Sequence, residues 1–229
     1  MSDDLYPQLA ELVRASRPVA LATVVAGAPV GEKLLVTPDR PARGSLGDPD
    51  LDRVVGRDAL GELDAGRSGV RHYGPQGQTG EEDVSVFIES FAPPPRMLIF
   101  GAVDFTGALA RLAKLVGFHV TVCDAREVFA TARRFPVADE VVVDWPHRLL
   151  ERVGPGLGPT DAVCVLTHDV KFDIPALLAS LRTEVGYIGA MGSRRTHADR
   201  VQRLRDEGAT DLELDRIMAP IGLDIGGRT

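Results

Sequence analysis

The fold is decided by the stretch RMLIFGAVDFTGALARLAKLVGFHVTVCDAR, which runs from Arg96 to Arg126. An apolar run of strand type leads into a glycine turn, a helical pattern follows, and a second apolar run ends in Asp124. Gly117 comes just after the helical pattern, where a residue with left-handed backbone ends many helices. The apolar positions at helical spacing are Phe105, Ala108, Leu109, Leu112, Ala113 and Val116. This order predicts a βαβ unit of a parallel sheet.

The glycine turn GAVDFT differs from the dinucleotide-binding fingerprint G-x-G-x-x-G. Gly101 can make the tight turn, but Val103 replaces the second glycine, which lets a pyrophosphate approach the backbone. Asp104 places a carboxylate at the start of the helix, where it suits the helix dipole but repels a phosphate. Asp124, about 20 residues further on, stands where a ribose-binding acid is expected. NAD(P) binding therefore stays an alternative, and Val103 speaks against it.

Three consecutive prolines, Pro93–Pro95, mark the boundary between two predicted domains, because they cannot continue a helix or a central strand. Residues 1–91 are predicted to form a small α+β domain, with a short helix and the strands VALATVV, KLLVT and VSVFIES. Residues 69–83 are predicted as loop, because they are rich in glycine and polar residues. Residues 92–229 are predicted to form the second domain.

In the second domain, near-continuous apolar strands alternate with amphipathic helices. This alternation predicts an α/β fold of Rossmann-like type, a doubly wound parallel sheet covered on both faces. Asp173 is predicted to cap the helix that contains Pro175, since proline is favoured in the first turn of a helix.

Composition narrows the class of protein. The net charge of −7 argues against a nucleic-acid surface, which needs a basic stripe. The acidic and then amphipathic N-terminus does not resemble a secretion signal, and no apolar run approaches the roughly 18 residues of a membrane-spanning helix. The two cysteines, Cys123 and Cys164, lie inside apolar runs and show neither a disulfide framework nor metal-ligand spacing. We therefore expect a cytoplasmic protein without a metal site, a nucleic-acid partner or a membrane partner.

Ligands of open α/β sheets bind beyond the carboxyl ends of the strands. The sequence GAMGSRR offers two free amides and two arginines at a predicted helix start, which would make a cradle for an anion. The same arginines could simply be solvated, and the histidine of THD could be structural. No nucleophile–base arrangement or paired carboxylates demand catalysis by this chain. The candidate ligand-binding residues at the strand ends are Gly101, Asp104, Asp124, His168, Asp169, Gly192, Ser193, Arg194 and Arg195.

Several stretches together resemble the XdhC/CoxI family of accessory proteins for xanthine dehydrogenase and related molybdenum hydroxylases. They are PPPRMLIFGAVDFTGALARLAKLVGFHVTVCDAR, RFPVADEVVVDWP, AVCVLTHDVKFDIPAL, VGYIGAMGSRRTHADRVQRL and RIMAPIGLDIGGRT. The resemblance implies a chaperone that binds molybdenum cofactor and assists its sulfuration and insertion into a partner hydroxylase. It also implies a homodimer, or a hetero-oligomer with a relative.

The sequence departs from the family pattern at functional positions. The first turn of the family usually reads GAGHVA, whereas Gly101 to Thr106 reads GAVDFT, and the cysteine motifs of the N-terminal domain are absent. A role for an N-terminal thiolate therefore cannot be carried over. The sequence favours a cofactor-binding accessory protein over an enzyme. An NAD(P)-dependent oxidoreductase and a degenerate paralogue that binds only protein stay open as alternatives.

Overall fold

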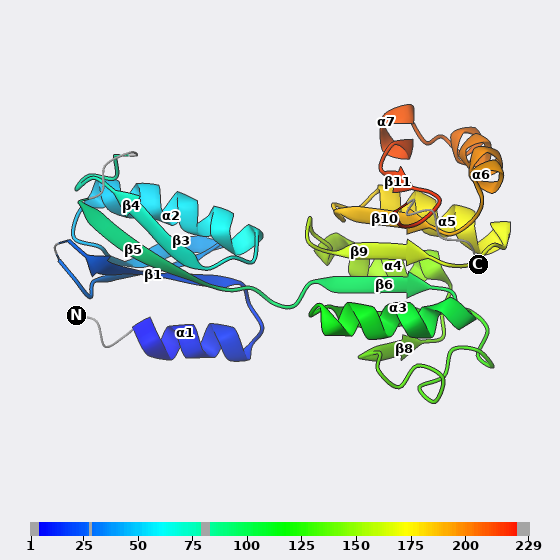
Figure 1. The fold of residues 1–229 in the computed structure, drawn as a ribbon, viewed down its shortest axis with the longest axis horizontal. Coiled ribbons are helices and arrows are strands. Elements are labelled where there is room, and N and C mark those ends of the chain that lie inside the picture. Colours follow the sequence, from blue (N-terminus) through cyan, green and yellow to red (C-terminus); the bar gives the residue numbers. More distant parts are fainter. Residues whose placement is uncertain (1–4, 28, 79–82, 224–229) are drawn as a thin grey trace. The chain divides into compact units, whose positions relative to one another are not determined.

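The computed structural model describes residues 5–27, 29–78 and 83–223, and divides the chain into two compact units, Met1–Pro93 and Pro94–Thr229. Each unit is a layered structure with its own core (Figure 1). Part of the predicted loop 69–83 and the end of the RIMAPIGLDIGGRT stretch lie outside the described residues.

The first unit is a five-stranded antiparallel sheet in the order β3-β2-β1-β5-β4, with one helix on each face. Helix α2 packs through Leu51 and Val55 on one face, and α1 packs through Leu5 on the other, against Val19 and Leu35. Its elements are α1 (Leu5–Arg14), β1 (Val19–Ala26), β2 (Lys33–Thr37), β3 (Arg40–Ser45), α2 (Pro49–Asp64), β4 (Gly69–Tyr73) and β5 (Val84–Phe91).

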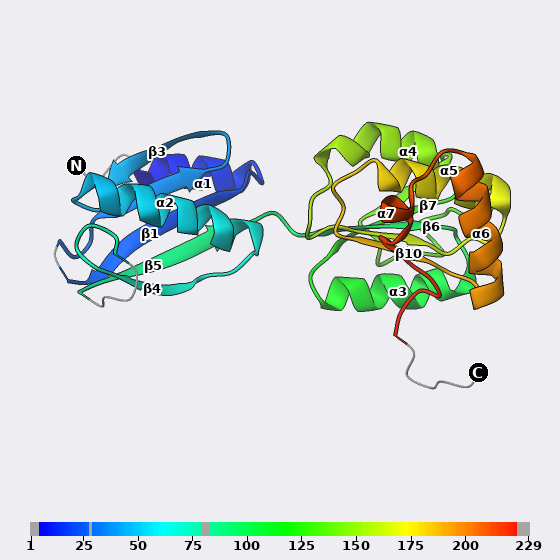
Figure 2. The same ribbon diagram turned by 90° about the horizontal axis from the view of Figure 1, so that it is seen from above.

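The second unit is a six-stranded parallel sheet in the order β11-β10-β9-β6-β7-β8. Helix α3 covers one face, and α4 and α5 cover the other (Figure 2). The predicted doubly wound α/β fold is confirmed. The elements are β6 (Arg96–Phe100), α3 (Asp104–Leu115), β7 (His119–Cys123), β8 (Glu140–Val142), α4 (Pro146–Val153), the 3-10 turn η1 (Gly154–Gly156), β9 (Ala162–Val165), α5 (Val170–Leu181), β10 (Tyr187–Ala190), α6 (Arg194–Asp206), α7 (Asp211–Leu214) and β11 (Ile217–Met218).

Two local predictions were wrong. Gly69–Tyr73 is the edge strand β4 and not a loop. Most of its side chains face solvent, so its sequence lacks the apolar alternation that would have predicted a strand. Helix α5 begins one turn earlier than predicted, and its cap is Asp169. Asp173 lies inside the helix and is buried. The left-handed Gly117 after α3 is confirmed, with φ of 93°.

Candidate functional site

The candidate site lies where the direction of strand addition reverses, between β6 and β9 in the centre of the sheet. These neighbouring strands are parallel, so their carboxyl ends meet at one edge (Figure 1). Open α/β sheets bind ligands in the crevice at this point. A cavity of about 350 Å³ lies here. It is lined by Ala102, Val103, Asp104, Phe105, Arg126, Phe129, Arg134, His168 and Met191.

The turn after β6 forms one wall of this cavity. Gly101 has a φ of 113°, which only glycine adopts readily. A Cβ atom here would lie 2.7 Å from Cγ2 of Thr167 at the end of β9, so the turn sits directly against the neighbouring strand. The Gly101 amide donates to the carbonyl of Cys123, and the buried Thr106 hydroxyl donates to the carbonyl of Gly101. The predicted role of Gly101 in a tight turn is confirmed, while its part in ligand binding stays a prediction.

Asp124 is buried at the end of β7 and its carboxylate is fully occupied within the protein. It accepts from the Ala102 amide at 2.8 Å and from the Arg126 amide at 2.9 Å. It also accepts from Nε and Nη2 of Arg126 at 2.9 and 2.7 Å. Burial would raise the pKa of Asp124, but the hydrogen bonds from Arg126 and the Ala102 amide outweigh burial and lower it. A ribose diol could bind this carboxylate only by displacing Arg126.

A loop after β7 supplies the cations and the aromatic ring of the site. The guanidinium of Arg126 lies over the Phe129 ring at 4.6 Å from its centroid, and that of Arg134 at 5.6 Å. Arg134 Nη1 also donates to the carbonyls of Ala102 and Phe129, at 3.0 and 3.2 Å. Two cations stacked on one ring form a wall suited to a planar anionic ligand. The sequence prediction missed Phe129 and Arg134, although the run REVFATARRF shows the mixture of basic and aromatic residues.

Asp104 and His168 both line the cavity, and their predicted contact with a ligand stays a prediction. The Asp104 side chain is fully exposed at the rim, and Oδ1 lies 3.8 Å from Nη2 of Arg134. Asp169, next to His168, instead caps α5 by accepting from the Lys171 amide at 3.2 Å. It therefore has a structural role, and its predicted contact with a ligand stays untested.

The predicted anion cradle lies at the start of α6, beside the cavity. Ser193 caps the helix by accepting from the Thr196 amide at 3.1 Å, and Gly192 has a φ of 142°. Arg194 and Arg195 are exposed on the first turn. From this segment the cavity wall takes only Met191, so the structure does not bring the four cradle residues into the wall.

A buried ion pair connects the segments that surround the cavity. Arg200 of α6 donates through Nη2 to Asp173 of α5 at 2.9 Å and to the Met191 carbonyl at 2.9 Å. The Thr167 hydroxyl at the end of β9 donates to the same carboxylate. Both side chains of the pair are at least nine-tenths buried. The pair therefore fixes the ends of β9 and β10 relative to each other. Sequence reasoning assigned Asp173 to a helix cap and gave no role to Arg200.

The two thiols lie outside the cavity wall. Cys123 and Cys164 are both buried, and burial raises the pKa of each thiol to about 12. Thiolate ligands or nucleophiles need a lowered pKa and access to solvent. In the described part of the chain, no group of three or more histidine, cysteine or acidic residues could hold a metal ion. The arrangement is suited to binding a ligand through cations, backbone and an aromatic ring.

The strand order, with its reversal between β6 and β9, defines a Rossmann-type domain. The chain belongs to the XdhC and CoxI family: residues 97–229 match the XdhC Rossmann domain, and residues 12–74 match the XdhC and CoxI family description. The family resemblance seen in the sequence is confirmed.

Named relatives include two bacterial proteins. A probable xanthine dehydrogenase component of Bacillus subtilis (strain 168) is 32% identical over 64% of this chain and 42% of its own length. The molybdenum cofactor insertion chaperone PaoD of Escherichia coli (strain K12) is 30% identical over 60% of this chain and 36% of its own length. The chain thus spans less than half the length of these relatives.

A solved structure shares the fold. The crystal structure of a xanthine dehydrogenase from Bacillus halodurans aligns with a TM-score of 0.66 and 24% identity, over 96% of this chain and 60% of that one. In the described part of the chain, no helix is long and apolar enough to cross a membrane.

Proposed function

We propose that this chain is an accessory protein that binds molybdenum cofactor and delivers it to a molybdenum hydroxylase. The observation that carries the proposal is the cavity at the reversal point, with Arg126 and Arg134 stacked on Phe129. Family membership supports it, since one relative is named a molybdenum cofactor insertion chaperone. Binding without turnover agrees with a wall that offers no activated nucleophile.

The residues present fit the organic part of this cofactor. A pyranopterin is polar, its pterin part is nearly flat, and it ends in a phosphate or a nucleotide diphosphate. Phe129 and the guanidinium groups beside it would contact the ring system, and Arg126 and Arg134 would hold the phosphate by charge-assisted hydrogen bonds. The cavity of about 350 Å³ lies within the usual range for small-ligand sites, about 300–1,000 Å³. His168 and Met191 would close the side next to β9 and β10.

The molybdenum atom itself has no thiolate ligand in this wall, because both cysteines are buried elsewhere with raised pKa values. When bound, the cofactor supplies the redox-active metal centre that a hydroxylase uses. This chain's own contribution is to hold the phosphate and shield the ring. Sulfuration of the metal would then need a donor of transferable sulfur, such as a persulfide, on a partner protein.

The partner in this proposal is a hydroxylase of the xanthine dehydrogenase type, and the chain acts in the cytoplasm. We also propose that the chain works as a homodimer or with a relative. Two exposed apolar residues on α3, Leu112 and Leu115, support an association surface, since large apolar side chains are seldom exposed in groups.

The test is to incubate the purified chain anaerobically with free molybdenum cofactor and to measure the pterin and molybdenum that co-elute from gel filtration. Arg134→Gln should reduce the retained cofactor about tenfold, because one charge-assisted contact is lost. Arg133→Gln is the matched control: it removes the same charge from the neighbouring exposed residue, which does not line the cavity. Arg194→Ala with Arg195→Ala tests the predicted cradle separately.

Retained pterin and molybdenum that depend on Arg134 would support the proposal. NADH retained in a parallel incubation, in place of the cofactor, would favour the oxidoreductase alternative, for which the occupied carboxylate of Asp124 leaves little room. Neither ligand eluting with the protein would favour the paralogue that binds only protein.

A further inference from the structure

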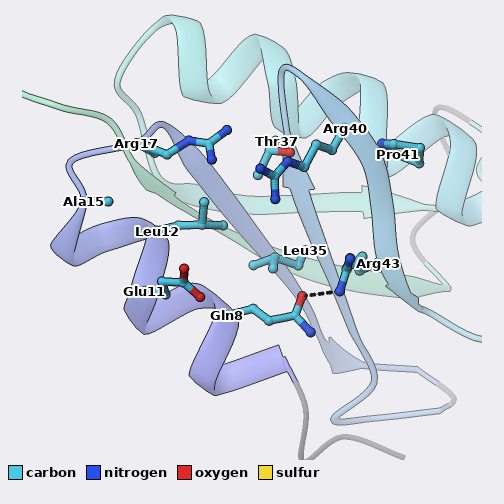
Figure 3. A pocket seen from close by; sticks show the side chains of 10 residues that line it. All are labelled: Gln8, Glu11, Leu12, Ala15, Arg17, Leu35, Thr37, Arg40, Pro41 and Arg43. Carbon is cyan, nitrogen blue, oxygen red and sulfur yellow. Dashed lines mark hydrogen bonds between the residues drawn. The ribbon is translucent and has the colours of Figure 1, made fainter.

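A second cavity, of about 360 Å³, lies in the first unit between α1 and the β2–β3 hairpin (Figure 3). All its lining residues belong to the unit Met1–Pro93, so it is a different feature from the site at the parallel sheet. Its lining residues are Gln8, Glu11, Leu12, Ala15, Arg17, Leu35, Thr37, Arg40, Pro41 and Arg43.

Three guanidinium groups line this cavity, and they share few negative partners. Arg17 pairs with Asp39 at 2.5 Å, and Nε of Arg40 lies 3.7 Å from the same carboxylate. Nη1 of Arg43 donates to the neutral Oε1 of Gln8 at 2.9 Å, and no ion pair of Arg43 occurs within the described ranges. The cavity is therefore locally cationic in a chain of net charge −7.

A β-bulge directs two of these arginines to the same side of the sheet. In the pairing of β2 with β3, Leu35 lies opposite Arg43, but Thr37 lies opposite Arg40. Two residues of β3 therefore face a single residue of β2, which is the definition of a bulge. Residues 40 and 43 would point to opposite faces of a regular strand. Because of the bulge, both side chains line the cavity.

An alternative explanation for these arginines is that charges on an edge strand block pairing with other strands. That role requires side chains directed to solvent and no particular partner. Arg40 and Arg43 are exposed, as that role requires, but Arg43 also contacts Gln8 on α1, across the cavity (Figure 3). The floor is apolar, with Leu12 and Leu35 next to the cations. The three guanidinium groups lie near two carboxylates, that of Glu11 in the lining and that of Asp39 beside Arg17 and Arg40. The combination of a cationic rim and an apolar floor matches a ligand with an anionic group on a compact apolar body.

We propose that this cavity binds a small phosphate monoester. The phosphate would lie between Arg40 and Arg43, and the apolar body would lie over Leu12 and Leu35. A phosphate carries about −1.5 to −2 charges and three acceptor oxygens, which suits several guanidinium groups better than a carboxylate does. One guanidinium group can bind two phosphate oxygens at once through two parallel hydrogen bonds. The proposal is independent of the function proposed for the second unit.

The test is a calorimetric titration of the full chain with phenyl phosphate at low ionic strength. Arg40→Gln and Arg43→Gln should each weaken binding about tenfold, as expected for loss of one charge-assisted hydrogen bond. The matched control is Arg53→Gln on α2, which removes the same charge from an exposed residue outside the lining. Phenol should not bind, and inorganic phosphate should bind more weakly than phenyl phosphate.

Every titration is repeated in an Arg134→Gln background, because the cavity of the second unit could also take phosphate. Binding that survives Arg134→Gln and is lost in Arg43→Gln supports the proposal, whatever the cofactor experiment shows. Binding that Arg134→Gln abolishes and Arg43→Gln leaves intact would assign it to the second unit and overturn the proposal. Equal weakening by Arg53→Gln, or the absence of saturable binding, would also overturn it.

Discussion

Replacing Gly101 with alanine tests the close contact between the first turn and the end of β9. An alanine here must adopt a φ near 113°, and its Cβ must lie 2.7 Å from Cγ2 and 3.0 Å from the amide nitrogen of Thr167. The backbone strain costs about 1–2 kcal/mol. The overpacking adds about 1–3 kcal/mol, because backbone cannot move aside as a flexible side chain can. We expect Gly101→Ala to lower the free energy of unfolding by about 2–5 kcal/mol.

Gly117→Ala is the matched control at the other end of α3. Gly117 also has a positive φ, of 93°, but nothing lies within 4 Å of a Cβ atom built there. Its substitution should therefore cost only the backbone strain, about 1–2 kcal/mol. The difference between the two variants isolates the contact with Thr167.

Urea unfolding followed by the fluorescence of the single tryptophan gives the measurement. Trp145 lies in the second unit, with its ring centroid 5.0 Å from that of Phe172, so its signal reports this unit. In Gly101→Ala the crowded turn should also be displaced into the crevice. This variant, unlike Gly117→Ala, should therefore retain less molybdenum cofactor in gel filtration. If Gly101→Ala destabilises the protein no more than Gly117→Ala, the steric argument is wrong.

Three further predictions concern buried groups. Arg200→Met leaves the Asp173 carboxylate buried without its partner and should cost about 3–5 kcal/mol in the same urea titration, whereas adding Asp173→Leu should recover most of the loss. The pKa of Asp124 is lower in the folded than in the unfolded chain, so this carboxylate stabilises the fold fully above its unfolded-state pKa of about 3.9. That stability is lost as pH falls through the folded-state pKa, and Asp124→Asn should remove this acid dependence of unfolding. Both buried thiols, with pKa raised to about 12, should resist alkylation at pH 8 until urea is added, as mass spectrometry would show.

Sequence reasoning succeeded where burial determines residue type. The parallel strands are buried on both faces and so read as apolar runs, which identified the Rossmann-like unit. The strands β3 and β4 carry no such signal, because they form the two edges of the antiparallel sheet and most of their side chains face solvent. Edge strands of this kind can be identified only from their partners.

The site was predicted in part for a similar reason. Gly101 and His168 follow buried strands directly, so the topology places them at the reversal point. Phe129 and Arg134 lie in an irregular loop whose path no periodicity determines, and only the folded chain shows that they face the first turn. Asp173 was predicted to be a helix cap because Pro175 was read as part of the first helical turn, and its partner in the fold, Arg200, is distant in the sequence.

Helix α3 shows why apolar spacing can predict a helix and still not predict its buried face. Most of its large apolar residues face outward, with Phe105 67% and Leu112 61% exposed, whereas Leu109 is half-buried and Thr106, Ala110 and Ala113 are buried against the sheet. Small side chains let the helix approach β6 and β7 closely, and Thr106 also satisfies the carbonyl of the turn. Helix α3 begins only three residues after Gly101, so the geometry of this turn determines which face of the helix packs against the sheet. Close packing at the turn therefore outweighs the burial of larger apolar side chains.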